Sequence, residues 1–201
     1  MPAAKNYLVL LMACCVMATL SSLETDAQSV PTAISDTTHV QRDGQHDFDF
    51  EFGTWKTHVS RLAHPLTGSK TWAEYDGTTV VHKVWGGQAN LVELDMKNAS
   101  SHVQLMSLRL YNPATHQWGL YVASSRGGTM GVPTVGSFAD GRGMFYDKET
   151  WDGKPIVVRF VITPRSADAV HFEQAFSADD GKTWEMNWIA DDTRMADRSR
   201  P

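Results

Sequence analysis

Three residues have side chains suited to acid–base chemistry on a small molecule: Glu173, Arg159 and Arg109. Glu173 is the catalytic candidate for a general base, and either arginine would stabilise an anion that develops during the reaction. Together they would make a cofactorless lyase, isomerase or hydrolase. No motif for a nucleophilic side chain accompanies them, so catalysis is the alternative and not the leading hypothesis.

Polar residues interrupt several apolar stretches. If these stretches line a ligand-binding interior, the polar residues could form hydrogen bonds with the bound molecule. Asn90 is in line with Val92 and Leu94, and Gln174 follows Phe172 on the same face of a predicted strand. A buried polar group needs a partner, which is either backbone and water or a ligand. The candidate ligand-binding residues are Asn90, Arg109, Tyr121, Ser124, Arg126, Arg159, Glu173, Gln174 and Trp188. Because the chain is also rich in Trp, Phe, Tyr and Met, the leading hypothesis is binding of a small, mostly apolar ligand.

Metal and cofactor chemistry finds little support in the sequence. The eight histidines are scattered without ligand spacing, so no metal site is predicted. Haem binding is a less favoured alternative that would need an axial ligand such as His82, His102 or His171. The two cysteines, Cys14 and Cys15, both lie near the N-terminus, so the rest of the chain has no thiol for a cofactor or for catalysis. No cofactor is expected.

The N-terminal residues have the pattern of a secretory signal peptide. Lys5 precedes an apolar run over residues 7–20, which is too short for stable membrane insertion, and small residues precede Gln28. Residues 1–27 are therefore predicted to be a signal peptide, and the protein to be periplasmic or secreted. A rival interpretation makes Cys14 the lipidated cysteine of a lipoprotein, but residues 16–20 stay apolar where a polar tether would begin.

Composition places one folded domain after this segment. The chain has 201 residues and a formal net charge of −5, so a nucleic-acid partner is not expected. Residues 28–45 are polar and aperiodic and predict a disordered tail. The folded domain is predicted over residues 46–194, and the charged residues 195–201 form a C-terminal tail.

The folded domain is predicted to be all-β. Short runs rich in Val, Leu, Phe, Tyr and Trp alternate with turn signals such as Asp76-Gly77 and Asp180-Gly181, and helical periodicity is almost absent. Strands are expected over residues 55–62, 71–75, 78–85, 89–97, 103–111, 118–125, 135–138, 143–148, 156–163, 169–177 and 183–190. Local hairpins without long crossovers favour an up-and-down antiparallel β-barrel of about ten strands.

Turn positions also predict which residues face each other across the hairpins. The expected pairs are Phe172 with Trp188, Phe160 with Phe172, Arg159 with Glu173, Glu173 with Asn187, Leu110 with Leu120, Leu108 with Val122 and Arg109 with Tyr121. In one interpretation the aromatic row Phe160, Phe172 and Trp188 faces the interior, and Arg159 with Glu173 is an exposed ion pair. In the other, the interior is partly polar and holds Arg109, Tyr121, Arg159 and Glu173 as an anion-recognising floor.

Several segments resemble known proteins. Gly53-Thr54-Trp55 with Arg194 resembles the signature of lipocalin-like (calycin) barrels, in which the Trp closes the barrel floor and the Arg packs across it. The wider pattern resembles a bacterial domain-of-unknown-function family of exported barrels, through residues 46–50, 107–115, 157–160 and 173–185. The resemblance implies a lipocalin-like fold from His46 to Arg194, with Gly53, Trp55 and Arg194 at the barrel closure. It implies no particular activity.

Overall fold

The computed structural model describes residues 43–196. The predicted signal peptide, residues 28–42 of the predicted tail, and residues 197–201 lie outside the described residues. The 3-10 helix η1 (Asp49–Glu51) comes first, and a second, η2 (Trp85–Gly87), joins two strands. The strands are β1 (Gly53–Leu62), β2 (Trp72–Val84), β3 (Ala89–Lys97), β4 (His102–Asn112), β5 (Gln117–Ser124), β6 (Thr134–Ala139), β7 (Arg142–Trp151), β8 (Lys154–Ser166), β9 (Ala169–Ser177) and β10 (Glu185–Arg194).

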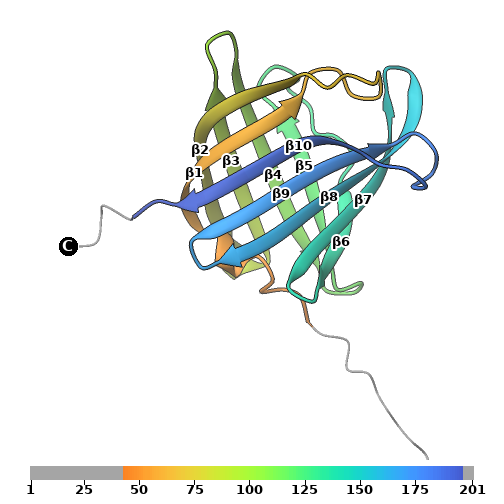
Figure 1. Cartoon of the computed structure of the whole chain (residues 1–201). Helices are drawn as coiled ribbons and strands as arrows, with labels where there is room; N and C mark the ends of the chain where they lie inside the picture. Colours follow the sequence, from red (N-terminus) through yellow and green to blue (C-terminus); the bar gives the residue numbers. More distant parts are fainter. Residues whose placement is uncertain (1–42, 197–201) are drawn as a thin grey trace, which may run out of the picture. The chain divides into compact units, whose positions relative to one another are not determined.

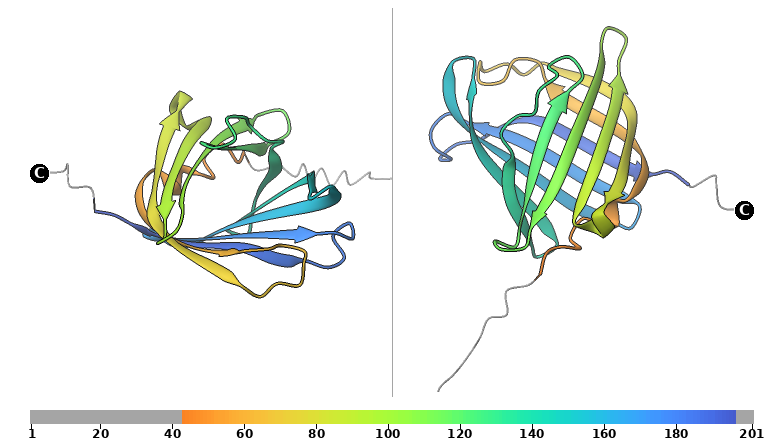
Figure 2. Two further views of the ribbon diagram at one scale, coloured as in Figure 1. Left: turned by 90° about the horizontal axis from the view of Figure 1, so that it is seen from above. Right: turned by 180° about the vertical axis from the view of Figure 1, so that it is seen from behind.

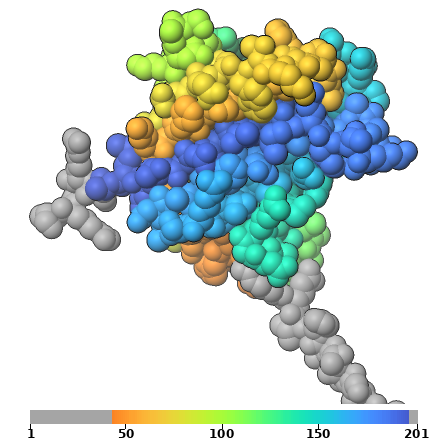
Figure 3. Space-filling model, in the orientation of Figure 1, coloured from red at the N-terminus to blue at the C-terminus, as the bar shows by residue number. Residues whose placement is uncertain are grey.

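These strands form one closed antiparallel barrel. Each strand pairs with the next along the chain, and β10 pairs with β1 to close the sheet. The strands run obliquely around a common centre (Figures 1 and 2). Outer side chains of β1, β10 and β9 cover one face in diagonal bands (Figure 3). The prediction of an all-β, up-and-down barrel of about ten strands is therefore confirmed.

Alternation of buried and exposed residues explains the strands. In β1, Trp55, Thr57 and Val59 are buried while Lys56 and His58 are exposed. Successive side chains of a strand point to opposite faces, so a closed barrel buries every second residue. Within residues 43–196, no helix has the length and apolar character needed to cross a membrane.

The predicted turn at Asp76-Gly77 is wrong. β2 is continuous through these residues, and Gly77 pairs with Thr57 on one side and with Met96 on the other. A Cβ atom at Gly77 would lie 2.1 Å from the backbone oxygen of Asp95. The glycine therefore permits a close approach of two strands and does not form a turn, and the two strands predicted over residues 71–85 are one.

The predicted register of β4 with β5 is also wrong, by one residue. Arg109 faces Leu120 and Leu108 faces Tyr121, whereas the prediction paired Arg109 with Tyr121 and Leu108 with Val122. Four residues separate Asn112 from its partner Gln117, whereas the predicted register paired Asn112 with Trp118 across five residues. A shift by one residue exchanges the two faces of a strand, and this places Arg109 inside the barrel.

Except at Asn187, which lines the cavity, the C-terminal hairpins have the predicted faces, but the partners differ. Phe160 faces Gln174 and not Phe172, Arg159 faces Ala175 and not Glu173, and Trp188 faces Gln174 and not Phe172. The Phe160 and Phe172 rings still stack, with centroids 6.1 Å apart. A β-bulge between Met186 and Trp188 adds Asn187 to β10, so Asn187 has no direct partner on β9 and does not face Glu173 as predicted.

The segment before β1 closes one end of the barrel. The ring of Phe48 is fully buried and makes an edge contact with Trp118 at a centroid distance of 4.9 Å. The indole nitrogen of Trp118 donates to the carbonyl of Gly44 at 2.9 Å, and the hydroxyl of Tyr111 donates to Asp43 at 2.6 Å. Asp43 and Gly44, which we assigned to the tail, therefore contact the barrel.

Candidate ligand-binding site

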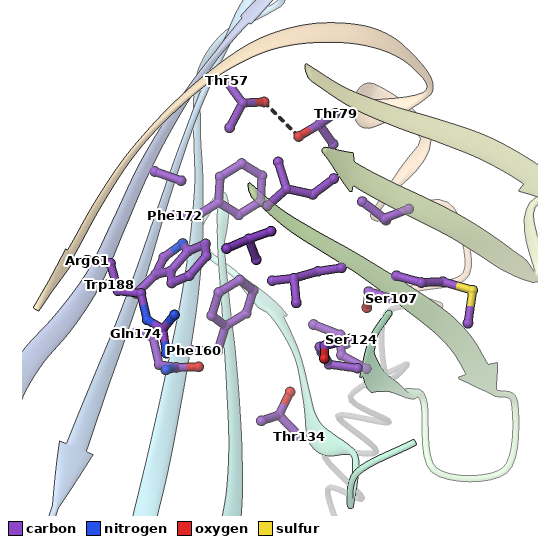
Figure 4. Close-up of a pocket in the computed structure, with 18 of the residues that line it drawn as sticks. Thr57, Arg61, Thr79, Ser107, Ser124, Thr134, Phe160, Phe172, Gln174 and Trp188 are labelled. Carbon is purple, nitrogen blue, oxygen red and sulfur yellow. Dashed lines mark hydrogen bonds between the residues drawn. The ribbon is translucent and has the colours of Figure 1, made fainter. Parts of the chain in front are cut away.

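A cavity of about 440 Å³ lies inside the barrel. Its wall is largely apolar, because every second residue of the surrounding strands contributes a hydrophobic side chain. Phe160, Phe172 and Trp188 form an aromatic wall on one side, and aliphatic side chains including Val92, Leu94, Leu105 and Leu120 line the rest (Figure 4). The aromatic row thus faces the interior, as the first interpretation predicted. The Arg159–Glu173 ion pair of that interpretation is wrong, because Arg159 stacks on Trp184 and Glu173 contacts Arg142 and His171. A space of this size, enclosed by apolar groups, suits one small molecule.

A buried ion pair lies at the end of the cavity that η1 closes. The guanidinium of Arg109 donates through both terminal nitrogens to the carboxylate of Glu51, and one of these bonds measures 3.2 Å. Both side chains are at least 95% buried, and the guanidinium lies 4.5 Å from the centroid of the Phe48 ring. A bidentate pair sealed in this way fixes both groups and neutralises both charges.

A third charged group, Asp192, lies beside this pair. Asp192 lines the cavity from β10 and is 3% exposed. Burial raises the pKa of Asp192 to about 7, and the nearby Glu51 carboxylate acts in the same direction, whereas Arg109 and a hydrogen bond from Thr57 act against it. The Thr57 and Thr79 hydroxyls are 2.6 Å apart. We call Glu51, Thr57, Thr79, Arg109 and Asp192 the cavity floor.

The opposite end of the cavity, the mouth, carries more exposed polar residues. Arg61, Ser124 and Thr134 line this end (Figure 4). Arg126 also lines the cavity and follows Ser124, the last residue of β5. Arg126 donates to the backbone oxygen of His102 at 2.9 Å.

Two further residues bring amide groups to the cavity wall. The amide of Gln174 donates to Oδ1 of Asn187 at 3.0 Å, which leaves Nδ2 of Asn187 without a partner among the described residues. This bond is possible because the bulge in β10 turns Asn187 inward.

A further buried carboxyl group lies on β7. Asp147 is 9% exposed, and burial, followed by the charge and hydrogen bond of Glu149, raises its pKa to about 7. Asp147 faces Val158 in the sheet and does not line the cavity. It contributes to the pH dependence of stability and not to the candidate site.

Five of the nine predicted ligand-binding residues line the cavity: Arg109, Ser124, Arg126, Gln174 and Trp188. Asn90 is fully buried on β3 opposite Arg109 but does not line the cavity, and its amide atoms have no partner among the described residues. The structure therefore brings five of the nine candidate residues around one space.

The remaining predicted residues point outward. Arg159 stacks on the ring of Trp184 at 4.3 Å, and Glu173 contacts His171 at 3.2 Å and Arg142 at 3.6 Å. Tyr121 shares the outer face with Leu108. The interpretation that placed Arg109, Tyr121, Arg159 and Glu173 together inside the barrel is therefore wrong for all but Arg109. Glu173 also lies on the opposite face of the sheet from Arg109, so the predicted catalytic set is not assembled.

The histidines considered as axial haem ligands lie outside the cavity as well. His82 and His102 are exposed and pair with Glu93 and Asp95, and His171 pairs with Asp191 at 2.7 Å. In the described part of the chain, no histidine lines the cavity, and no group of His, Cys, Asp or Glu is placed to hold a metal ion.

Four residues of the cavity floor were not predicted from the sequence. Thr57 and Asp192 continue the alternation of their strands, two residues before Val59 and two after Ala190, so period-two counting would have placed both inside. Thr79 follows the same rule in β2. Glu51 lies on a single 3-10 turn, where no periodicity exists to indicate its direction.

Comparison with known proteins gives a fold and no family. No family model matches the sequence, and no curated protein matches it either. The crystal structure of Rv2717c from M. tuberculosis is similar with a TM-score of 0.50 and 12% sequence identity, over 77% of this chain and 98% of that one. This similarity shows a shared lipocalin-like (calycin-like) barrel fold.

Two designed barrels are similar at lower scores. A de novo fluorescence-activating β-barrel covers 77% of this chain and 99% of its own, with 12% identity and a TM-score of 0.41. A second, described as EF1p2_mFAP2b bound to DFHBI, covers 76% of this chain and 99% of its own, with 7% identity and a TM-score of 0.43. Similarities at this level do not bear on function.

Proposed function

We propose that this protein is a binding barrel that holds one small, mostly apolar molecule in its interior. The observation that carries the proposal is the cavity of about 440 Å³, walled by Phe160, Phe172 and Trp188 and closed at one end by the floor. An apolar molecule that enters it exchanges water for aromatic and aliphatic contacts, which is favourable by roughly 25 cal/mol per Å² of apolar surface.

The neutral fluorophore N-phenylnaphthylamine tests the proposal. Its emission should rise saturably with one molecule per barrel. Ser107→Phe adds a ring inside the cavity and should weaken binding at least about tenfold, a change of about 1.4 kcal/mol. The matched control is Ser137→Phe, because Ser137 is exposed on the outer face of β6.

The two variants must differ if the proposal is correct. An unchanged affinity in Ser107→Phe, or an equal loss in both variants, would place the fluorophore outside the cavity and overturn the binding function. Circular dichroism of both variants excludes a loss of fold as the cause.

We also propose export to the periplasm or the medium, which rests on the N-terminal pattern of Lys5 and the apolar run at residues 7–20. Membership of the bacterial family of exported barrels of unknown function is a proposal of the same kind and rests on the quoted segments. Sequencing the N-terminus of protein from its own host tests export, since a mature chain should begin near Gln28, and an intact Met1 would contradict it.

A further inference from the structure

The cavity floor contains one more carboxyl group than it contains cations. Arg109 is bound at both terminal nitrogens by Glu51, so these two charges cancel. Among residues 43–196, Asp192 forms no ion pair and its Oδ1 accepts no hydrogen bond. An ionised carboxylate that is buried without a counter-charge is unfavourable, so this position is incomplete unless a proton or a cation occupies it.

We propose that Asp192 binds a protonated amine at the buried end of the ligand, so that the ligand is an apolar organic cation. The inference rests on the proposed function and adds the chemical class of the molecule. An ammonium group has three donors and no acceptor. Oδ1 of Asp192 and the hydroxyl oxygens of Thr57 and Thr79 can accept from it, while the alkyl or aromatic part lies against Phe172 and Trp188.

The surrounding charges favour a cation over an anion at this position. The charged groups that act on Asp192 are Glu51 from η1, Arg109 from β4 and its outward-facing neighbour Asp191. An anion placed there would meet two carboxyl groups and an arginine that is already bound by Glu51. A neutral alcohol would bring no counter-charge, so Asp192 would still have to hold a proton or remain a buried, uncompensated carboxylate.

The arginines at the mouth do not reverse this preference. Arg61 and Arg126 line the cavity at the mouth, and both are exposed to solvent. Charges in contact with water are screened within about 8 Å at physiological salt, whereas the floor is shielded from water. These arginines affect how fast a cation enters more than how strongly the floor holds it.

Proton release provides a signature of this binding mode. Because Asp192 has a pKa of about 7, it carries a proton below that pH in the free protein, and an incoming ammonium group replaces the proton. The affinity for the amine should therefore rise with pH, about tenfold between roughly pH 6 and pH 8, and binding at about pH 6 should release close to one proton. The amine itself stays protonated over this range.

The experiment uses three probes with the same chain and different ends: octylamine, octanol and octanoate. Each competes with N-phenylnaphthylamine for the full-length protein. At about pH 8 we expect octylamine to bind at least about tenfold more tightly than octanol, and octanoate to bind most weakly. Calorimetry in two buffers with different heats of ionisation measures the released proton.

Asp192→Asn keeps the shape of the side chain and removes its charge. It should abolish the advantage of octylamine over octanol and the dependence of octylamine binding on pH. Asp191→Asn, one residue away on the outer face, should keep both. Equal affinity for octylamine and octanol in the wild type, or an unchanged preference in Asp192→Asn, would overturn the inference and leave the binding barrel intact. If none of the probes binds, the proposed function itself fails and this inference fails with it.

Discussion

The guanidinium of Arg194 lies over the indole ring of Trp55, 4.0 Å from its centroid. The two residues face each other where β10 closes against β1. The guanidinium also donates to the backbone oxygens of Phe50, Phe52 and Ala167 at 2.5 to 3.0 Å. The side chain of Arg194 thus connects β10 with the segment before β1 that closes the end of the barrel. The stacking contact predicted from the sequence is confirmed.

Arg194→Ala should lower the free energy of unfolding by roughly 2 to 4 kcal/mol, because a cation–π contact and three charged hydrogen bonds are lost together. Urea unfolding provides the measurement. Arg165→Ala, which removes an exposed ion pair with Asp191, is the control and should cost less than about 1 kcal/mol. Equal midpoints for Arg194→Ala and the wild type would refute the closing role of Arg194.

Glu51→Gln should be far more damaging than Glu173→Gln. The first substitution leaves the buried guanidinium of Arg109 without its counter-charge, which typically costs about 3 to 5 kcal/mol. Glu173 lies on the outer face, where its contact with Arg142 is half exposed, so its loss should change stability by less than about 1 kcal/mol.

The double variant Glu51→Gln, Arg109→Met separates the pair from other effects. It removes both charges and should be more stable than Glu51→Gln alone. If Glu51→Gln alone were as stable as the wild type, the Glu51–Arg109 pair would not be sealed from water.

Stability should fall as pH rises because of Asp192. A carboxyl whose pKa is raised to about 7 binds its proton more tightly in the folded chain than in the unfolded chain, where the value is near 3.8. The folded state is therefore favoured at low pH and loses about 1.4 kcal/mol per pH unit between these values. Asp147, whose pKa is raised to about 7, acts in the same direction.

Asp192→Asn isolates this contribution. Its stability relative to the wild type should increase steadily between about pH 4 and pH 7 and then level off. Urea unfolding of both proteins across this range gives the difference. A difference that stays constant would mean that Asp192 holds no proton in the folded state.

Gly77→Ala should destabilise the barrel by about 3 kcal/mol or more, since the added Cβ would collide with the backbone of β3 and not with a movable side chain. Gly131→Ala is the control: its nearest atom lies 3.7 Å away, and Gly131 is not among the positive-φ glycines, so the change should be small. Thermal unfolding distinguishes the two. Equal melting temperatures would show that β2 and β3 can separate at Gly77 without cost.

The fold was predictable because every strand alternates and every connection is local. Registers were harder, because they depend on exact turn lengths. The connection after Asn112 is one residue shorter than the predicted register implies, and this exchanged the partners of Leu108 and Arg109 on β5. The bulge at Asn187 restored the even spacing of the last hairpin, so the aromatic row was predicted on the correct face although its partners were not.

The site was only partly predictable for the same reason. Trp188 and Gln174 were found because the faces of their strands were predicted correctly. Arg159 was wrongly included, because alternation along a strand divides its residues between two faces but does not show which face is inside the barrel. Glu51 pairs with Arg109 across 58 positions of the chain, and no local pattern reports such a contact. A charge pair between segments so far apart in the sequence becomes visible only once the closed barrel brings the segments together.

The indole N–H resonances of the tryptophans test the central claim most directly. Trp188 lines the cavity, whereas Trp85 is 72% exposed on η2 and serves as an internal control. In nitrogen-15 NMR spectra titrated with N-phenylnaphthylamine, the resonance of Trp188 should shift saturably, with the same affinity as the fluorescence change, while that of Trp85 stays in place. If the probe binds but shifts the resonance of Trp85, or leaves the resonance of Trp188 unchanged, the ligand does not lie inside the barrel.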